Sequence, residues 1–360
     1  MRVLKLALFD WRNYENVVYE PIEAVNIVFG KNAQGKTNLL EAVYIASRAA
    51  SFRQGQSKDI VRKGKQEGRL SLDFLSGGRE QNIEIRMFAD GRRKELMLNG
   101  VPVKKSGDLA GVFCTVLFAP EHLGLVRDGP EERRKFLDSA VSQLRPKYAA
   151  ALADYSRVVS QRNNLLKRGG GDTLAVWDRR LLDLGSYIVM MRGSYVAKLK
   201  ESATAHHRAI SKGENLEIIY KSFVESEDTL CDINALKAEM EQKLFELKPR
   251  ELEAGISLIG PHRDDLELLI DGATARIYGS QGQQRSIVLS LKFAECEIVE
   301  VQAGEPPVLL LDDVMSELDK TRQAYIRKNI GGRQVIITTV RRSKNGTSVK
   351  GGRLSPCIYT

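Results

Sequence analysis

The sequence lacks the marks of membrane, secreted and zinc-binding proteins. No segment has eighteen consecutive apolar residues, and the start of the chain, Met1 to Asp10, is too short and interrupted for a signal peptide. The four cysteines have no C-x-x-C spacing and the four histidines have no metal-ligand spacing, so paired zinc ligands are excluded and reduced thiols are expected. We therefore expect a cytoplasmic protein without a membrane partner, and we expect the adjacent His206 and His207 on its surface.

Sustained heptad repeats are also absent, which excludes long coiled-coil arms. The end of the chain, residues 341–360, has no acidic residue and neither strand nor helix periodicity, so we expect a basic flexible tail. Over 360 residues the net charge is +9. This charge favours an anionic partner, because lysines and arginines that neutralise phosphates release counterions, although a basic surface without a ligand has the same composition.

The first chemical motif is a glycine-rich segment, Gly30 to Thr37. It fits G-x-x-x-x-G-K-[ST], follows an apolar run from Val25 to Phe29, and precedes apolar residues at helical spacing from Thr37 to Ala50. A strand, a glycine loop and a helix in this order are the context that a phosphate-binding loop requires. An ordinary glycine-rich turn between a strand and a helix is the alternative interpretation.

The residue types in this loop suit ATP and Mg²⁺. Gly30 and Gly35 allow backbone N–H groups to point inward around phosphate oxygens, where the helix dipole adds to their field. Lys36 is expected to reach the β- and γ-phosphates, and the Thr37 hydroxyl is expected to bind Mg²⁺. We assign nucleotide binding to the loop and the start of its helix: Gly30, Lys31, Asn32, Ala33, Gln34, Gly35, Lys36, Thr37 and Asn38.

The second motif is an apolar run, Val308 to Leu311, that ends in Asp312 and Asp313. Continuous apolar residues are typical of a parallel strand covered on both faces, and carboxylates at the C-terminal end of such a strand lie beside a nucleotide crevice. We assign Asp312 to Mg²⁺ and Asp313 to positioning or deprotonating water, and with Lys36 they form the expected catalytic set. A buried strand followed by an aspartate turn is the alternative.

The third motif is the segment Ser280 to Arg285. Ser280 is a good helix N-cap, and a serine- and glycine-bearing helix N-terminus can face an anion. Because the chain already has a phosphate loop, the simplest use of this second anion site is to complete a nucleotide bound to another subunit. A capped amphipathic helix without a ligand is the alternative. The helix, Gln283 to Val301, has these apolar residues on one expected face: Ile287, Val288, Leu291, Ala294, Ile298 and Val301.

Strand and helix patterns occupy separate parts of the chain. Residues 130–250 show helical patterns that are broken at Gly169 to Gly171, and strand patterns resume near 255. A tight hairpin turn is expected at Asn99 and Gly100. The expected strands are Val3 to Leu8, Val25 to Phe29, Leu70 to Phe74, Ile83 to Phe88, Glu95 to Leu98, Leu266 to Ile270 and Val335 to Thr339.

These patterns predict an α/β protein in four parts. Residues 1–128 would form the N-terminal part of a nucleotide-binding head and residues 254–340 its C-terminal part. Residues 129–253 would form an inserted helical lobe, and residues 341–360 the basic tail. At 1.5 Å per residue, two antiparallel helices in the insert would reach only a few tens of ångströms, so we expect a compact lobe.

The order of these motifs resembles an ABC-type ATPase head, and within that class it resembles the RecF family of bacterial recombination and repair proteins, which is related to the SMC and Rad50 heads. The fold implied is a mixed sheet with a phosphate-loop helix and a compact helical second lobe. The residues that carry the resemblance lie between 1 and 340: Arg12-Asn13-Tyr14, the phosphate loop, Ser51-Phe52-Arg53, Phe118-Ala119-Pro120-Glu121, Gly129-Pro130, Arg133-Arg134, Gly260 to Asp265, Ser280 to Arg285, Asp312-Asp313 and Ser316 to Asp319.

The resemblance implies further site roles. Arg12 and Asn13 would lie near the adenine or the ribose. Ser280, Gly282 and Gln283 of the partner subunit would contact the γ-phosphate, so that ATP holds a homodimer together. Such dimers are similar to clamps that close on DNA and reopen after slow, DNA-stimulated hydrolysis. The implied role is recombinational repair and replication, with double-stranded and gapped DNA, RecR, RecO and indirectly RecA as partners.

Two positions depart from the pattern of the wider class. ABC heads usually carry a metal-sensing Gln, but this chain has Pro120 and Glu121 near the expected place, so that role is unassigned. The His that commonly touches the γ-phosphate after the last strand is replaced by Thr338 and Thr339.

Other functions share these motifs. A transporter motor would have the same nucleotide motifs with a membrane partner, and a nuclease of the overcoming-lysogenization type would need an acidic domain after the head. An SMC-like structural chromosome clamp would differ in its partners and not in its site chemistry. Several basic side chains could contact DNA or serve only as solvated or structural groups: Arg133, Arg134, Arg157, Arg162, Lys167, Arg168 and Arg263.

Overall fold

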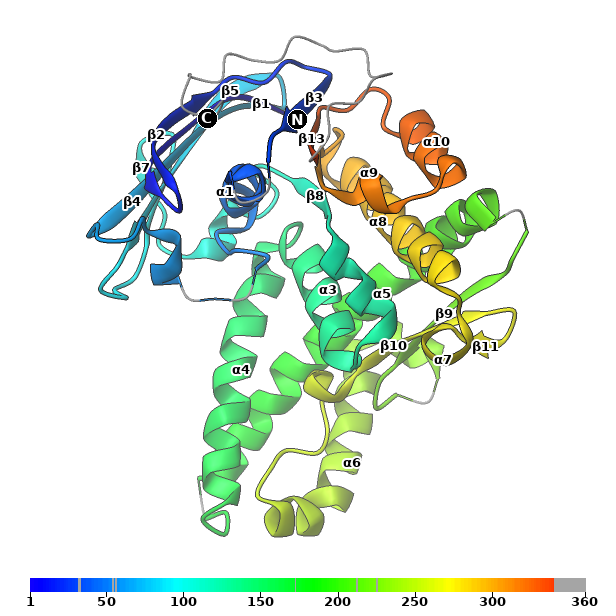
Figure 1. Cartoon of the computed structure of the whole chain (residues 1–360). Coiled ribbons are helices and arrows are strands. Elements are labelled where there is room, and N and C mark those ends of the chain that lie inside the picture. Colours follow the sequence, from blue (N-terminus) through cyan, green and yellow to red (C-terminus); the bar gives the residue numbers. More distant parts are fainter. Residues whose placement is uncertain are drawn as a thin grey trace. The chain divides into compact units, whose positions relative to one another are not determined.

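The computed structural model describes residues 1–31, 34–53, 55, 57–171, 173–211, 213–224 and 226–339. The chain forms two compact units (Figure 1). Unit 1 contains Met1–His122 and the described residues from Lys292 onward, and unit 2 contains Leu123–Leu291. The expected tail lies outside the described residues. Residues 254–291 pack with unit 2, whereas the sequence placed them in the ATPase head, so the division into head and lobe stays a prediction.

An antiparallel sheet in unit 1 has the strand order β2-β1-β4-β5-β6-β7. Buried leucines pair across it, since Leu6 and Leu8 of β1 lie opposite Leu72 and Leu70 of β4. Such inward apolar residues, alternating with outward ones, are what gives a sheet one buried face. The strands are β1 (Arg2–Trp11), β2 (Tyr14–Tyr19), β4 (Glu67–Ser76), β5 (Arg79–Phe88), β6 (Glu95–Leu98) and β7 (Val101–Pro102).

The turn between β6 and β7 is the one that the sequence predicts. Asn99 and Gly100 both have positive φ, at 51° and 76°. Two central residues with positive φ match the right-handed twist of the flanking strands, and Asn followed by Gly adopts that conformation at low cost.

A parallel sheet in unit 1 has the strand order β3-β13-β12-β8. Its strands are β3 (Val25–Phe29), β8 (Thr115–Phe118), β12 (Val308–Asp312) and β13 (Val335–Thr339). All five residues of β12 are buried, as its continuous apolar pattern predicts. Because parallel strands end at the same edge of a sheet, the C-terminal ends of β3, β12 and β13 lie together.

Helix α1 (Lys36–Arg48) packs against both sheets of unit 1. In Figure 1 it lies between the strands of the antiparallel sheet and β8. Its buried residues include Leu39, Leu40, Val43 and Ile45, which are fully buried in the core of the unit. The unit also contains α9 (Val314–Glu317) and α10 (Lys320–Asn329).

Unit 2 is mainly helical. Its helices are α2 (Gly124–Arg127), α3 (Pro130–Ser142), α4 (Pro146–Leu166), α5 (Leu174–Ser211), α6 (Ile233–Ala254) and α7 (Ala275–Tyr278). Helix α5 packs against α3, α4 and α6, so the described residues form a compact helical unit without a long coiled-coil arm. Helices α4 and α5 are separated at the predicted break, Gly169 to Gly171.

The helical prediction for residues 130–250 was wrong at one place. Strand β9 (Leu216–Lys221) lies between α5 and α6 and pairs with β10 (Asp265–Ile270). With β11 (Ala273–Thr274), the two form a three-stranded antiparallel sheet within unit 2. The alternation of buried and half-buried residues in β9 is a short strand pattern that is easily lost beside two long helices.

Helix α8 (Gln281–Ala303) is buried on more than one face, unlike a helix that lies on the surface with one apolar side. Five of the six residues on its predicted apolar face are buried, but Val301 is 83% exposed. Phe293, Cys296 and Val299 are buried as well. The periodicity therefore located the helix but misplaced the end of its buried surface. Within the described residues, no helix is both long and apolar enough to cross a membrane.

Candidate nucleotide-binding site

The phosphate-loop motif lies between the end of β3 and the start of α1. Gly35 is the N-cap of α1, with φ 95°, and a Cβ added to it would lie 2.5 Å from Asn13 Nδ2. The backbone angle favours glycine at this position, and a side chain there would also displace Asn13. No side chain caps α1, and its first turn has no acidic residue. Its first N–H groups therefore fit an anionic ligand such as a phosphate.

Lys36 lies folded over this loop. Its Nζ donates hydrogen bonds to the carbonyl oxygens of Gly30 and Lys31, both at 2.8 Å. Gln34 closes the loop from the other side, because its Oε1 accepts a hydrogen bond from Lys31 N at 2.8 Å. The ammonium group is thus held at the loop, as its predicted role requires. Asn32 and Ala33, which the sequence also assigns to nucleotide binding, lie outside the described residues.

The second motif meets the first at Thr37. Thr37 Oγ1 donates a hydrogen bond to Asp312 Oδ1 at 3.0 Å, and Thr338 Oγ1 donates to the same carboxylate oxygen at 2.5 Å. Asp312 and Thr338 are both buried. A hydroxyl and a carboxylate are the hard oxygen donors that Mg²⁺ binds beside nucleotide phosphates. The donor set therefore fits the expected ion, and Thr37 and Asp312 would be the residues that hold it.

Asp313 has an unusual backbone conformation. Its φ is 50°, which is uncommon for a residue with a side chain. Its N–H donates to the carbonyl and hydroxyl oxygens of Thr338, at 3.2 and 3.1 Å, and its Oδ1 accepts from Ser316 Oγ at 3.0 Å. These bonds fix the backbone and the carboxylate of Asp313 directly after the end of β12. Its predicted role toward water stays a prediction.

Arg12 makes an ion pair beneath the loop. Its Nη2 and Nε donate to the two carboxylate oxygens of Glu41 at 2.6 and 2.9 Å, and its Nη1 donates to Asp59 O at 2.7 Å. Glu41 is fully buried in α1, and Ser51 Oγ also donates to it, at 2.5 Å. Arg12 thus stabilises a buried carboxylate, and its predicted place near adenine or ribose stays a prediction.

Asn13 and Tyr14 support the loop directly. Asn13 Nδ2 donates to Gln34 O at 3.3 Å, and its Oδ1 accepts from Asn38 Nδ2 at 2.7 Å. Tyr14 donates its hydroxyl hydrogen to Gly35 O at 2.9 Å. Burial raises the pKa of Tyr14 to about 12, so this donor keeps its proton at neutral pH. Tyr14 and Glu41 are site-supporting residues that no spacing rule in the sequence could assign.

The place expected for a metal-sensing Gln contains a short helical turn, Pro120–Leu123. Within it, His122 Nδ1 accepts a hydrogen bond from Ala119 N at 3.1 Å. Burial and the nearby Lys292 and Arg48 lower the pKa of His122 well below its usual value, which favours this neutral acceptor. The sensing role therefore remains unassigned.

The third motif lies in unit 2. Ser280 is exposed, and its Oγ accepts a hydrogen bond from Gln283 N at 3.2 Å, while Gln283 Oε1 accepts from Ser280 N at 2.8 Å. This reciprocal pair is a capping box, which confirms the predicted N-cap. Gly282 follows within the first turn of α8. The contact of these residues with a partner's nucleotide stays a prediction.

The arginines near Gly260 to Asp265 are occupied by structural contacts. Arg133 pairs with Asp265 at 2.6 Å, and Arg134 Nη1 donates to Asp264 O at 2.7 Å. Arg263 donates to Ser257 O at 2.9 Å. Arg162 is fully buried with Glu251, at 2.5 Å, so its suggested contact with DNA is wrong.

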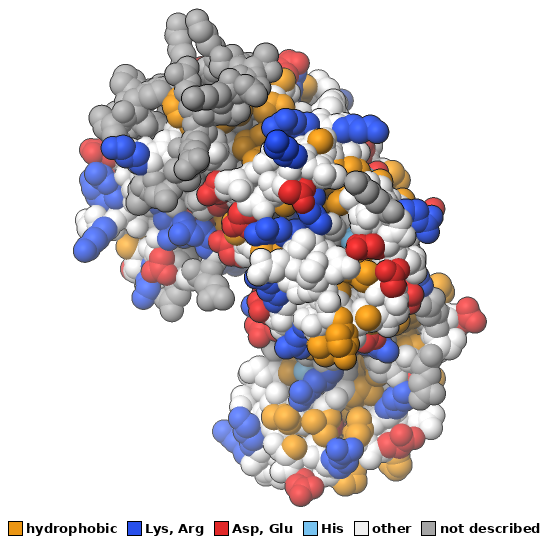
Figure 2. Space-filling view, turned by 45° about the vertical axis from the view of Figure 1, so that its right-hand side comes forward, with side chains coloured by type: hydrophobic (Ala, Val, Ile, Leu, Met, Phe, Trp, Pro, Cys, Tyr) orange, Lys and Arg blue, Asp and Glu red, His pale blue; other side chains and the backbone are white. Residues whose placement is uncertain are grey.

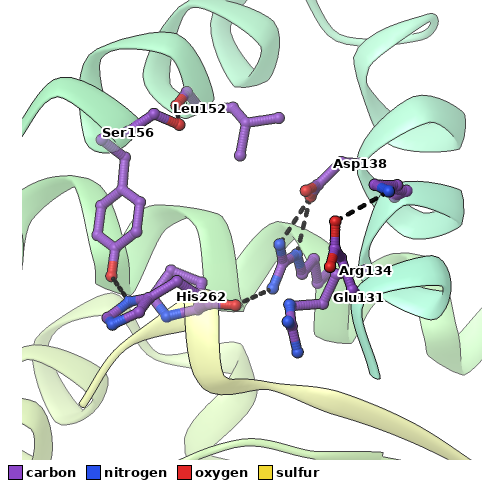
Figure 3. A pocket seen from close by; sticks show the side chains of 10 residues that line it. Glu131, Arg134, Asp138, Leu152, Ser156 and His262 are labelled. Carbon is purple, nitrogen blue, oxygen red and sulfur yellow. Dashed lines mark hydrogen bonds and ion pairs between the residues drawn. The ribbon is translucent and has the colours of Figure 1, made fainter. Parts of the chain in front are cut away.

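A small cavity of about 200 Å³ lies beside the same loop. Figure 3 shows Glu131, Arg134 and Asp138 on one side of it and His262 on the other, with Leu152 and Ser156 above. The groups around it are mutually paired, since Tyr155 bonds His262 Nδ1 at 2.7 Å and the buried Arg192 pairs with Asp138 at 2.8 Å. This cavity belongs to the packing of unit 2.

The charged surface gives no single basic patch on the face shown in Figure 2. Lys and Arg side chains there alternate with Asp and Glu. Exposed basic side chains also form ion pairs with acids on the same helix, such as Lys135 with Glu131 at 2.9 Å and Arg157 with Asp154 at 3.1 Å. The positive net charge therefore does not by itself locate a DNA-binding surface.

Comparison with known proteins places this chain in a family. A family model described as the RecF/RecN/SMC N terminal domain matches residues 2–350. The DNA replication and repair protein RecF of Alkaliphilus oremlandii is 39% identical over 342 residues, which cover 94% of this chain and 93% of that protein. The RecF of Lachnoclostridium phytofermentans is 38% identical over 344 residues, covering 94% and 92%.

Solved structures agree with this assignment. A structure of the recombination mediator protein RecF-ATPrS in the RecFOR pathway has a TM-score of 0.90 and 36% identity, covering 95% of this chain and 93% of that one. An SMC head domain from Pyrococcus furiosus, with a TM-score of 0.53 and 16% identity over 94% and 89% of the two chains, shares the fold alone. The chain has an ABC-type ATPase fold and belongs to the RecF family, within the wider group of RecF, RecN and SMC proteins.

Proposed function

We propose that this chain is an ATP-dependent DNA-binding protein of recombinational repair and replication. ATP bound at the phosphate loop of one subunit would be capped by Ser280, Gly282 and Gln283 of the partner subunit, so that ATP induces a homodimer. The dimer would bind duplex DNA or gap junctions, and hydrolysis would release it. A protein with this role would work in the cytoplasm with the bacterial chromosome.

The contact between Thr37 and Asp312 is the observation that carries this proposal. It joins the phosphate loop to the acid-ended strand at 3.0 Å, where Lys36 bonds the loop and Asp313 follows Asp312 in the chain. Bound Mg²⁺ would neutralise phosphate charge between Thr37 and Asp312. The ammonium of Lys36 would hold the terminal phosphates, and the carboxylate of Asp313 would orient water or accept its proton.

Slow hydrolysis follows from the division of the site between two chains. A monomer would bind nucleotide with its own loop, but it would lack the cap supplied by Ser280 of the partner subunit. The chemical step would then depend on association, and DNA that favours the dimer would stimulate it. The enzyme would be a weak, DNA-stimulated ATPase that produces ADP and phosphate.

The proposed partners come from the family. Relatives are named DNA replication and repair proteins, and one solved relative is described as a recombination mediator of the RecFOR pathway. By analogy this chain would act with RecR and RecO and help to load recombinase at gaps. Its net charge of +9 is in keeping with a phosphate-rich partner.

Sedimentation of the purified protein tests the proposal. The protein would be run with ATP, with ADP and without nucleotide, each with and without duplex DNA, beside the Lys36→Ala variant. We expect a dimer only with ATP, greater DNA retention in that state, and loss of both in the variant. Retention should fall steeply with salt because phosphate contacts release counterions. A monomer in ATP, or equal DNA retention in all nucleotide states, contradicts the proposal.

A further inference from the structure

Two side chains from outside the third motif, Ser280 to Arg285, bond the motif at the start of α8. On one side, Gln283 Nε2 donates to Glu214 Oε1 at 3.0 Å. On the other, Arg127 Nε donates to Gln284 Oε1 at 2.8 Å. We propose that Glu214 and Arg127 are positioning residues of the third motif, which fix the amides of Gln283 and Gln284 and thereby set where Ser280 presents its hydroxyl. This inference rests on the proposed function.

The Glu214 contact gives the Gln283 amide one orientation. Ser280 N–H can only donate, so it requires the amide oxygen, and the Glu214 carboxylate can only accept, so it requires the amide NH₂. Turning the amide over would break both bonds. Glu214 therefore stabilises the capping box from outside the helix.

Glu214 also lies close to a buried histidine of α5. It lies between α5 and β9, and its second oxygen, Oε2, lies 3.4 Å from Nε2 of His207. His207 is fully buried in α5, which corrects the surface position expected for it. One carboxylate oxygen thus accepts a hydrogen bond from the start of α8, and the other lies close to the imidazole of α5. A carboxylate confined between two elements in this way can orient the group that it binds.

The Arg127 contact holds the backbone just before Ser280. Gln284 is buried, and its Nε2 donates to Gly279 O at 3.1 Å. Arg127 also receives a bond from this segment, because Arg276 Nε donates to Arg127 O at 3.1 Å. Gly279 has no room for a side chain, since a Cβ there would lie 2.5 Å from Ala275 O. The turn that presents Ser280 is therefore fixed by Gln284 and Arg127.

These contacts leave Ser280 able to donate. Its Oγ accepts from Gln283 N–H, and its hydroxyl hydrogen has no acceptor among the residues that the structure describes. The Gln283 side chain, in contrast, uses both of its polar atoms. The geometry thus favours the Ser280 hydroxyl as the group that donates to a terminal phosphate, with Gln283 as its support.

The test uses subunit mixing. A residue that positions the third motif serves the same half of the shared site as Ser280, so a subunit with Lys36→Ala should complement its loss and a subunit with Ser280→Ala should not. When Lys36→Ala and Glu214→Ala subunits are mixed, both defects fall in one shared site of the mixed dimer and the other site is intact. We expect ATPase activity to recover. When Ser280→Ala and Glu214→Ala subunits are mixed, each site retains a defect, and we expect no recovery. Arg127→Ala should behave as Glu214→Ala does.

Single variants supply the controls. Glu214→Ala should lower kcat about tenfold, because a hydrogen bond to a charged group is lost, while ATP binding by the monomer is unchanged. Glu214→Gln retains an acceptor oxygen and should restore most of the activity. Glu217→Ala removes a nearby acid on β9 whose side chain accepts a hydrogen bond from Asn215 Nδ2 at 3.3 Å and is not bonded to the third motif in the described part of the chain. This variant should retain wild-type turnover. Thermal unfolding followed by circular dichroism shows whether each variant is folded.

The outcomes separate this inference from the proposed function. Mixed Lys36→Ala and Ser280→Ala subunits serve as the reference pair. If the reference pair recovers and the Lys36→Ala and Glu214→Ala pair does not, the positioning role is wrong and the shared site stands. Wild-type turnover in Glu214→Ala also overturns the positioning role. If the reference pair itself fails to recover, the shared site is wrong, and the inference that rests on it is overturned with it.

Discussion

Thr37 Oγ1 and Asp312 Oδ1 lie 3.0 Å apart although 275 positions separate them in the sequence. The parallel sheet explains this approach. Strand β13 pairs with β3 on one side and with β12 on the other, so the segment after β3 and the end of β12 meet at one edge. A hydroxyl and a carboxylate at that edge are the kind of oxygen donors that would hold Mg²⁺.

Asp312→Asn should lower ATPase turnover by about 100-fold or more, because the neutral amide is a poor ligand for Mg²⁺. The fold should be retained, since Asn has the same size and its oxygen can accept from Thr37 and Thr338. Turnover measured against Mg²⁺ concentration, beside thermal unfolding, checks this prediction. A variant that hydrolyses ATP at the wild-type rate with wild-type Mg²⁺ dependence would remove Asp312 from the metal site.

Thr338 is expected to orient the carboxylate of Asp312 as well. Its hydroxyl donates to Asp312 at 2.5 Å and accepts from Asp313 N at 3.1 Å. Thr338→Val keeps the shape but loses both bonds, so we expect turnover to fall about tenfold, with Thr338→Ser restoring it. Steady-state kinetics of the two variants provide the comparison. Equal turnover in Val and Ser variants would show that the hydroxyl has no part in holding the carboxylates.

Arg12→Ala should destabilise unit 1. It would leave the fully buried Glu41 without its bidentate partner, at a cost of about 3 kcal/mol in the free energy of unfolding. The double variant Arg12→Ala/Glu41→Gln should recover part of this loss, because the buried charge is removed too. Urea unfolding of both variants and of Glu41→Gln alone measures the coupling. A stable Arg12→Ala with a raised KM for ATP would instead indicate a direct role at the nucleotide.

His262 should make the protein less stable in mild acid. Burial lowers the pKa of His262 from 6.5 to about 4, so between these values the unfolded chain takes up a proton that the folded chain refuses. The free energy of unfolding therefore carries no penalty from His262 above pH 6.5, and it decreases as the pH falls toward 4. Burial raises the pKa of Asp264 to about 6, which acts in the opposite direction, so a comparison of variants is needed.

The variant for this comparison is His262→Gln. Between pH 7 and pH 5, the wild type should lose about 2 kcal/mol more of its free energy of unfolding than the variant does. Urea unfolding at the two pH values gives both differences. Parallel losses in the two proteins would mean that His262 is not the group responsible.

The strongest predictions from the sequence were those with a strict local pattern. Strands β3, β6 and β13 have the bounds that periodicity predicts, and the Asn99-Gly100 turn has the required positive φ at both residues. The phosphate loop, the acid-ended strand and the N-cap at Ser280 were each recognisable because one chemical function constrains neighbouring residues.

Predictions failed where distant contacts decide the outcome. His207 lies in a polar stretch, yet it is fully buried beside Glu214, and Arg162 is buried because Asp178 and Glu251 pair with it. Burial of these charged or polar groups depends on partners far along the chain, which periodicity cannot supply. The supporting roles of Tyr14, Glu41 and Glu214 are invisible in the sequence for the same reason.

Mixing Lys36→Ala and Ser280→Ala subunits tests the central claim, that each nucleotide is shared by two chains. Each variant alone should be inactive, since every site in its dimer carries a defect. Random association of equal amounts makes half of the dimers mixed, each with one intact site, so we expect about a quarter of the wild-type ATPase activity. Activity that stays at the level of the separate variants, while sedimentation shows that mixed dimers form, would contradict the account.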